Sequence, residues 1–133
     1  LTILVSTPYM DEAGRCERVG LLQEGRLLRV DPPERLGRDF GRPLLAVRGP
    51  DRHGLLGLLR EHPDAEAVFP FGQEIHFTDR RTDAPAARRA RELEAWLVEH
   101  GAEDVSVEAT EPGVEDVFMD LMGEPSRAAA GRR

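Results

Sequence analysis

Residues 74–78, Glu-Ile-His-Phe-Thr, alternate strictly between polar and apolar side chains. A period of two is typical of a strand with one buried face and one exposed face. A turn at Gly72-Gln73 comes directly before this stretch, and residues 65–71 form an apolar run before the turn. The two runs therefore predict two consecutive strands, and the elements on either side of them decide the fold.

Helical patterns flank these two strands in the sequence. One helix is predicted to begin at Asp51, its N-cap, and to end before Pro63, and a longer helix covers residues 86–100. Their inner faces are predicted to carry Leu55, Leu56, Leu58, Leu59, Ala87, Ala90, Leu93 and Leu97. Both patterns have the period that places apolar side chains on one side of a helix.

Two further strands are predicted at residues 44–48 and 105–109. Residues 43–109 therefore have the order βαββαβ, which is typical of a ferredoxin-like domain of the α+β class. In that fold two helices cover one face of a four-stranded antiparallel sheet. The other face is left for water or a partner.

The first six residues, Leu-Thr-Ile-Leu-Val-Ser, form a nearly continuous apolar run. Such a run is typical of a strand buried on both faces in a parallel sheet. Thr7 as N-cap and Pro8 at the first helical position predict a helix through about Arg18. Because a parallel strand needs neighbouring βαβ units and none precedes it here, we expect the chain to be a piece of a longer protein.

Residues 19–23 and 26–30 predict a hairpin in which Gly25 supplies a positive φ. Asp31 as N-cap and Pro32 at the first helical position predict a short helix after it. These elements are expected to form a strand-helix-hairpin remnant of an α/β domain, placed before the ferredoxin-like domain.

A final helix is predicted from apolar residues at helical spacing, namely Val114, Val117, Phe118, Leu121 and Met122. The residues after it are small residues and arginines, which are typical of a disordered tail. We therefore expect three parts: residues 1–40, a domain over residues 43–123, and a disordered tail over residues 124–133.

Composition excludes several classes of function. The 133 residues are 40% hydrophobic and 32% charged, as in ordinary soluble globular proteins. A net charge of -7 argues against a nucleic-acid-binding protein, and no apolar run approaches the ~20 residues of a membrane span. The single cysteine, Cys16, rules out a disulfide framework. The chain contains no lysine and therefore no Gly-x-x-x-x-Gly-Lys-Ser/Thr phosphate loop.

The histidines do not predict a metal site. They are His53, His62, His76 and His100, and they fall on different predicted elements with no pair at helical spacing. Structural roles are therefore expected for all four. His62 and His100 are expected at helix C-termini, where the helix dipole favours a charged imidazole.

The other polar clusters have structural explanations. Ser6-Thr7 lies outside any Gly-x-Ser-x-Gly frame, which argues against a nucleophile. Asp11-Glu12 and Glu115-Asp116 fall in first turns of helices, where carboxylates stabilise the dipole. Arg88-Arg89 is expected to face solvent, and Trp96 is expected in the core or at an interface. The chain is therefore predicted to hold no catalytic, cofactor-binding or metal-binding residue.

Three stretches nevertheless resemble a known family. Residues 2–13, Thr-Ile-Leu-Val-Ser-Thr-Pro-Tyr-Met-Asp-Glu-Ala, are similar to the closing strand and switch region of an ABC transporter ATP-binding subunit. Residues 21–36 resemble the hairpin and short helix that end that family's nucleotide-binding domain. Residues 111–118, Glu-Pro-Gly-Val-Glu-Asp-Val-Phe, resemble the last helix of the C-terminal extension in drug and ABC-2-type exporters.

The resemblance implies that residues 1–40 end a nucleotide-binding domain and that residues 43–123 form an accessory domain with a regulatory or architectural role. The parent protein would use ATP and Mg²⁺ and couple ATP hydrolysis to export. It would lie at the cytoplasmic side of the cell membrane, with a second nucleotide-binding domain and a membrane permease subunit as partners. The piece alone would be inactive, would bind no nucleic acid, and could form a homodimer.

The resemblance also assigns one position of the switch region. Members of the family place a histidine after the closing strand, where it contacts the γ-phosphate of ATP. Pro8 occupies this position, and proline has no side-chain donor. We therefore expect a degenerate site, or one of two unequal nucleotide-binding domains.

Two other classes of function remain open at this point. Ferredoxin-like βαββαβ units often bind small effectors or dimerise, so a ligand-sensing module is the main alternative. Only Gly49 and Gly54 are available for an effector-binding loop after the first strand of the domain. A free-standing enzyme is the weaker alternative, because no catalytic constellation is visible.

Overall fold

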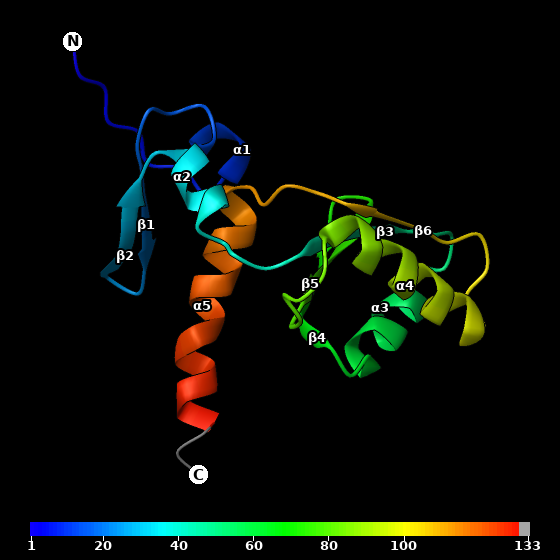
Figure 1. The fold of residues 1–133 in the computed structure, drawn as a ribbon. Coiled ribbons are helices and arrows are strands. Elements are labelled where there is room, and N and C mark those ends of the chain that lie inside the picture. Colours follow the sequence, from blue (N-terminus) through cyan, green and yellow to red (C-terminus); the bar gives the residue numbers. More distant parts are fainter. Residues whose placement is uncertain (131–133) are drawn as a thin grey trace. The chain divides into compact units, whose positions relative to one another are not determined.

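The computed structural model describes residues 1–130 and divides into two compact units. The first, which we call the hairpin unit, joins Leu1–Phe40 with the segment that begins at Pro112. The second, the sheet unit, comprises Gly41–Glu111. Figure 1 shows the elements of both units along the chain.

The sheet unit has the βαββαβ order predicted from the sequence. Its elements are β3 (Leu44–Arg48), α3 (Arg52–Glu61), β4 (Ala65–Phe71), β5 (Glu74–Asp79), α4 (Ala86–Glu99) and β6 (Ser106–Ala109). The strand order in the sheet is β4-β5-β3-β6, and every neighbouring pair is antiparallel. This is the ferredoxin-like topology, so the predicted α+β fold class is confirmed.

The core of the sheet unit lies between one face of the sheet and helices α3 and α4 (Figure 1). Asp51 caps α3 by accepting the backbone N–H of Gly54 at 3.0 Å, as the sequence predicts. The cluster of buried core residues consists of Leu45, Val47, Leu55, Leu59, Ile75, Phe77, Ala90, Leu93, Leu97 and Val107.

Strand β5 differs from the prediction of a half-exposed strand. His76 and Thr78, on the face away from the helices, are as buried as Ile75 and Phe77 on the core face. β5 is an inner strand between β4 and β3, so side chains of neighbouring strands cover this second face. The ring of Phe71 stacks on the His76 imidazole, with centroids 4.2 Å apart and planes at 7°.

The hairpin unit is built from short elements and one long helix. These are α1 (Met10–Ala13), β1 (Val19–Gln23), β2 (Arg26–Asp31), α2 (Pro33–Arg38) and α5 (Val114–Ala130). Strands β1 and β2 form the predicted antiparallel hairpin. Glu24 and Gly25 both have positive φ, 50° and 76°, which is the backbone of a type I′ turn.

Helix α5 belongs to the hairpin unit, which differs from the expected domain over residues 43–123. It packs against α1 and α2, and Val114 and Val117 of its apolar stripe are buried there together with Leu36. The helix continues to Ala130, where a disordered tail was expected from residue 124. The last three positions of that expected tail lie outside the described residues.

The opening residues do not form the predicted strand. Leu1, Ile3, Leu4 and Val5 have no strand conformation and are largely exposed. A strand needs backbone hydrogen bonds to a neighbour, and none of the described strands pairs with this segment. An apolar pattern indicates that a segment can form a strand, but it does not show that a pairing strand is present.

The two predicted N-terminal helices are shorter than expected and begin later. Helix α1 begins at Met10, and the chain turns irregularly from Gly14 to Arg18. Helix α2 has Pro32, not Asp31, at its N-cap. Asp31 is the last residue of β2, and its carboxylate instead accepts the Arg29 Nε–H at 2.7 Å.

Candidate functional site

The turn before α1 holds the residues that resemble a nucleotide-switch region. Thr7 donates its hydroxyl hydrogen to Glu12 Oε2 at 2.6 Å and accepts the backbone N–H of Tyr9 at 3.0 Å. These two bonds fix the backbone on both sides of Pro8. They also tie Thr7 to Glu12 in the first turn of α1.

The predicted acidic pairs lie where the sequence places them. Asp11 and Glu12 are in the first turn of α1, and Glu115 and Asp116 are in the first turn of α5. Asp116 is buried and accepts the backbone N–H of Gly113 at 2.9 Å, which satisfies a donor at the helix start. The expected capping role of this pair is therefore confirmed for Asp116.

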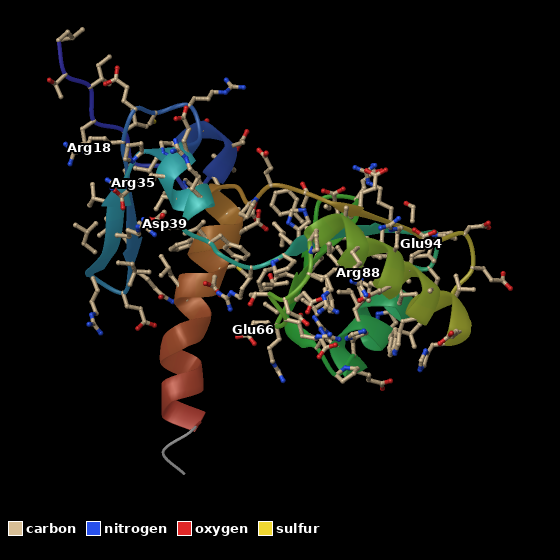
Figure 2. All side chains as sticks on the ribbon, viewed as in Figure 1. Arg18, Arg35, Asp39, Glu66, Arg88 and Glu94 are labelled. Carbon is tan, nitrogen blue, oxygen red and sulfur yellow. The ribbon has the colours of Figure 1, made fainter. Side chains whose placement is uncertain are left out.

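The arginine pair on α4 differs from the prediction that both side chains face solvent. Arg88 is exposed on α4 (Figure 2) and pairs with Glu92 one turn later, with Nε and Oε1 3.1 Å apart. Arg89 is only 4% exposed and lies inside the sheet unit. Arg89 follows Ala86 by three positions and precedes Leu93 by four, so helical spacing already placed it on the apolar face.

Three carboxylates surround the buried guanidinium of Arg89. Its Nη1 donates to Glu92 Oε2 at 2.8 Å, and its Nη2 donates to Asp83 Oδ1. Its Nε lies 3.9 Å from Oδ2 of Asp79, whose side chain is 6% exposed, and makes no hydrogen bond within the described residues. Asp79 Oδ1 accepts the backbone N–H of Arg81 at 2.8 Å.

This buried charge cluster joins the end of β5 to the first turns of α4. Hydrogen bonds from Arg81 and then Arg89 hold the pKa of Asp83 below its usual range. Charges that satisfy one another in this way stabilise the polar loop over residues 80–85. The ion pairs of Arg89 therefore hold this loop to α4.

The four histidines occupy different surroundings. His53 is exposed near the start of α3. His76 is buried in β5, with Nε2 3.0 Å from Glu74 Oε1. Burial raises the pKa of Glu74, but hydrogen bonds from His76 and Arg48 outweigh it, so this pKa lies below its usual range.

His62 and His100 end α3 and α4 and flank the ring of Trp96. The expectation that the helix dipole favours a charged His62 is wrong. Burial lowers the pKa of His62 and outweighs the attraction of Asp64 and Asp79. Among the described residues, no group of three or more His, Cys, Asp or Glu side chains could hold a metal ion.

Helix α4 is also tied to the edge of the sheet. Glu94 of α4 (Figure 2) accepts the backbone N–H of Val107 in β6 at 3.2 Å. Within the described residues no helix combines the length and the apolar character needed to cross a bilayer.

The chain is similar to two proteins described as probable multidrug ABC transporter ATP-binding proteins. It is 28% identical, over 128 residues, to the probable multidrug ABC transporter ATP-binding protein YbhF of Escherichia coli (strain K12), and equally to YbhF of Shigella flexneri. The match covers 92% of this chain and 20% of the relative, so the chain spans about a fifth of the relative's length. No protein-family model matches the chain.

Proposed function

We propose that this chain is the C-terminal regulatory or architectural part of an ABC transporter ATP-binding protein. The similarity to YbhF supports a relationship to ABC transporter ATP-binding proteins. In this proposal the whole protein couples ATP hydrolysis to export on the cytoplasmic side of a membrane. Its partners are a second nucleotide-binding domain and a membrane permease.

One structural observation carries the proposal. The three stretches that resemble the family lie far apart in the sequence, yet α1, the β1-β2 hairpin, α2 and the start of α5 all belong to the hairpin unit. Helix α5 contacts both α1 and α2. In this proposal the hairpin unit adjoins a nucleotide-binding domain, and the sheet unit is a separate accessory domain.

In this proposal ATP and Mg²⁺ are not held by this chain alone. The absence of lysine, and of any group of three or more His, Cys, Asp or Glu side chains suited to a metal among the described residues, supports that part of the proposal. We therefore derive no step of hydrolysis within this chain. In the proposal, ATP and Mg²⁺ bind residues of the whole protein that lie outside it.

The alternative of a ligand-sensing module has no supporting observation. A β-carbon on Gly49 would stand 2.7 Å from Leu55 Cδ1, and Gly54 donates its N–H to the cap residue Asp51. Both glycines are thus explained by packing and capping at the start of α3. They do not form an open loop for an effector.

A chimera tests the proposed function. The segment of Escherichia coli YbhF that matches this chain is replaced by this chain, and ATP binding and hydrolysis are compared with the unmodified relative. A second chimera replaces residues 41–111 by a short Gly-Ser linker. We expect the first chimera to bind ATP and the second to differ from it in hydrolysis rate or in membrane recovery. If removal of the sheet unit changes neither property, the regulatory or architectural role is wrong.

The same chimera tests Pro8. Because proline cannot donate to the γ-phosphate, we expect Pro8→His to raise the hydrolysis rate, by up to about 100-fold, at similar ATP affinity. Pro8→Ala is the matched control, since it removes the ring without adding a donor. An unchanged rate in folded Pro8→His would show that Pro8 does not limit hydrolysis.

A further inference from the structure

The single tryptophan of the chain lies between two imidazoles. The His100 ring stacks on the indole of Trp96, with centroids 3.9 Å apart and planes at 24°. The His62 ring meets the same indole edge-on at 4.6 Å and also meets Phe77 edge-on at 5.4 Å. The C-terminal ends of α3 and α4 therefore meet at one aromatic ring.

The hydrogen bond of His62 requires a neutral ring. Nδ1 of His62 accepts the backbone N–H of Asp64 at 3.0 Å, so this nitrogen cannot carry a hydrogen. A second proton on the imidazole would occupy Nδ1 and break the bond. The bond closes the turn from α3 into β4, where Ala65 also donates its N–H to the His62 carbonyl at 3.1 Å.

His100 has the opposite arrangement. Its Nδ1 lies 2.7 Å from the backbone carbonyl oxygen of Trp96, which can only accept, so Nδ1 is the donor. A proton added at Nε2 leaves this bond in place. The ring is exposed, ends a helix and stacks on an indole, and each of these features tolerates a positive charge.

The charged groups around His62 come from three elements. Asp64 in the following turn and Asp79 in β5 favour its protonation, and His100 on α4 opposes it. Asp64 is shared with Arg81, whose Nη1 lies 3.6 Å from Oδ2. Burial is the largest influence, and the pKa of His62 lies below its ordinary value of 6.5. Below pH 6.5, a falling pH therefore stabilises any state in which His62 is free to be protonated, relative to the folded state described here.

We propose that His62, Trp96 and His100 form a proton-sensitive latch that holds the turn between α3 and β4 against the end of α4. Protonation of His100 leaves the latch closed, and protonation of His62 opens it. Opening would free the turn that leads into β4, which is an edge strand of the sheet. The latch acts within the sheet unit and does not depend on the proposed transporter function.

The test is a titration of the intact chain from pH 8 to pH 4.5, in which Trp96 emission is recorded together with the NMR signals of the imidazoles and of the Asp64 amide. We expect a step in the emission of Trp96 with its midpoint below pH 6.5. It should coincide with titration of His62 and with a shift of the Asp64 amide.

Three variants assign the step to His62. His62→Asn keeps an acceptor near the Asp64 amide and cannot titrate, so the step should be lost. His100→Phe keeps the stack on Trp96, so the step should remain. His53→Asn removes an exposed imidazole near the other end of α3 and should leave the step unchanged.

Three results would overturn the proposal. The first is titration of His62 at or above pH 6.5 in the unmutated chain, and the second is an Asp64 amide that does not respond to that titration. The third is a step that persists in folded His62→Asn. If His62→Asn does not fold, the NMR titration of the unmutated chain decides the question alone.

Discussion

The backbone of Gly37 in α2 lies directly against Pro112, just before α5. A β-carbon on Gly37 would stand 2.7 Å from the Pro112 carbonyl oxygen, a distance that real β-carbons do not adopt. The approach of these two residues lets α5 pack on α2 and close the hairpin unit. Glycine is needed at this position because of space, and not because of an unusual φ.

Gly37→Ala should therefore destabilise the hairpin unit. Overpacking against backbone costs about 1–3 kcal/mol, which exceeds the ~1 kcal/mol that alanine contributes as a better helix former. Gly57 in α3 is the matched control, since a β-carbon there meets nothing within 4 Å. Urea unfolding followed by circular dichroism should give a lower midpoint for Gly37→Ala and a higher one for Gly57→Ala. Equal shifts in the two variants would contradict the packing of α5 on α2.

Removal of the buried arginine should destabilise the sheet unit strongly. Arg89→Met leaves the Asp79 carboxylate buried without its guanidinium, and breaking such a pair costs about 3–5 kcal/mol. Arg88→Met, on the exposed side of the same helix, should cost no more than about 0.5 kcal/mol. Urea unfolding followed by Trp96 emission measures both changes within the sheet unit.

The double variant Asp79→Asn/Arg89→Met provides a second check on this cluster. It removes the uncompensated charge, so it should be more stable than Arg89→Met alone. If Arg89→Met lowers the free energy of unfolding no more than Arg88→Met does, the guanidinium is not buried against Asp79 in solution.

Glu74 should contribute to stability above its ordinary pKa of 4.5 and lose that contribution in acid. Its pKa is lower in the folded chain, so the folded state favours the charged form and the unfolded state takes up protons first as pH falls. Glu74→Gln should be less stable than the unmutated chain at pH 7, and the difference should shrink towards pH 3. Glu61→Gln, at an exposed position of the same unit, serves as the control. A difference that stays constant with pH would show that Glu74 acts without its charge.

The sheet unit should fold without the rest of the chain. Every residue of its core cluster lies within Gly41–Glu111, so excision of these residues leaves that core intact. We expect residues 41–111 to unfold cooperatively in urea, with a change in the emission of the half-buried Trp96. A longer piece, residues 41–123, carries the apolar face of α5 without α1 and α2 and should self-associate in sedimentation. If only the longer piece folds, α5 belongs to the sheet unit after all.

The predictable part of the fold is the part specified by local patterns. The β1-β2 hairpin follows from two apolar runs around Gly25, and the order of the sheet unit follows from alternation in β5 and helical spacing in α4. Each pattern involves residues close in sequence. The physical rules that connect such patterns to a strand, a turn or a helix need no knowledge of distant contacts.

Three of the features that were missed depend on distant partners. Periodicity shows that α5 has an apolar face but not that α1 and α2 cover it. The helical spacing of Arg89 places its side chain on the buried face of α4. A buried arginine is tolerated there because Asp79, on another element, lies beside it. The charge state of His62 depends on burial beside Trp96, which opposes the dipole expected from its place at a helix end.

In the proposed function this chain is the non-catalytic part of an ATP-binding protein. The most direct test of this proposal is equilibrium binding of a fluorescent ATP analogue with Mg²⁺, measured by anisotropy for the intact chain and for the YbhF chimera. We predict saturable binding to the chimera and none to the chain alone across the micromolar to millimolar range typical of enzyme substrates. Saturable binding to the chain alone, displaced by unlabelled ATP, would contradict the account.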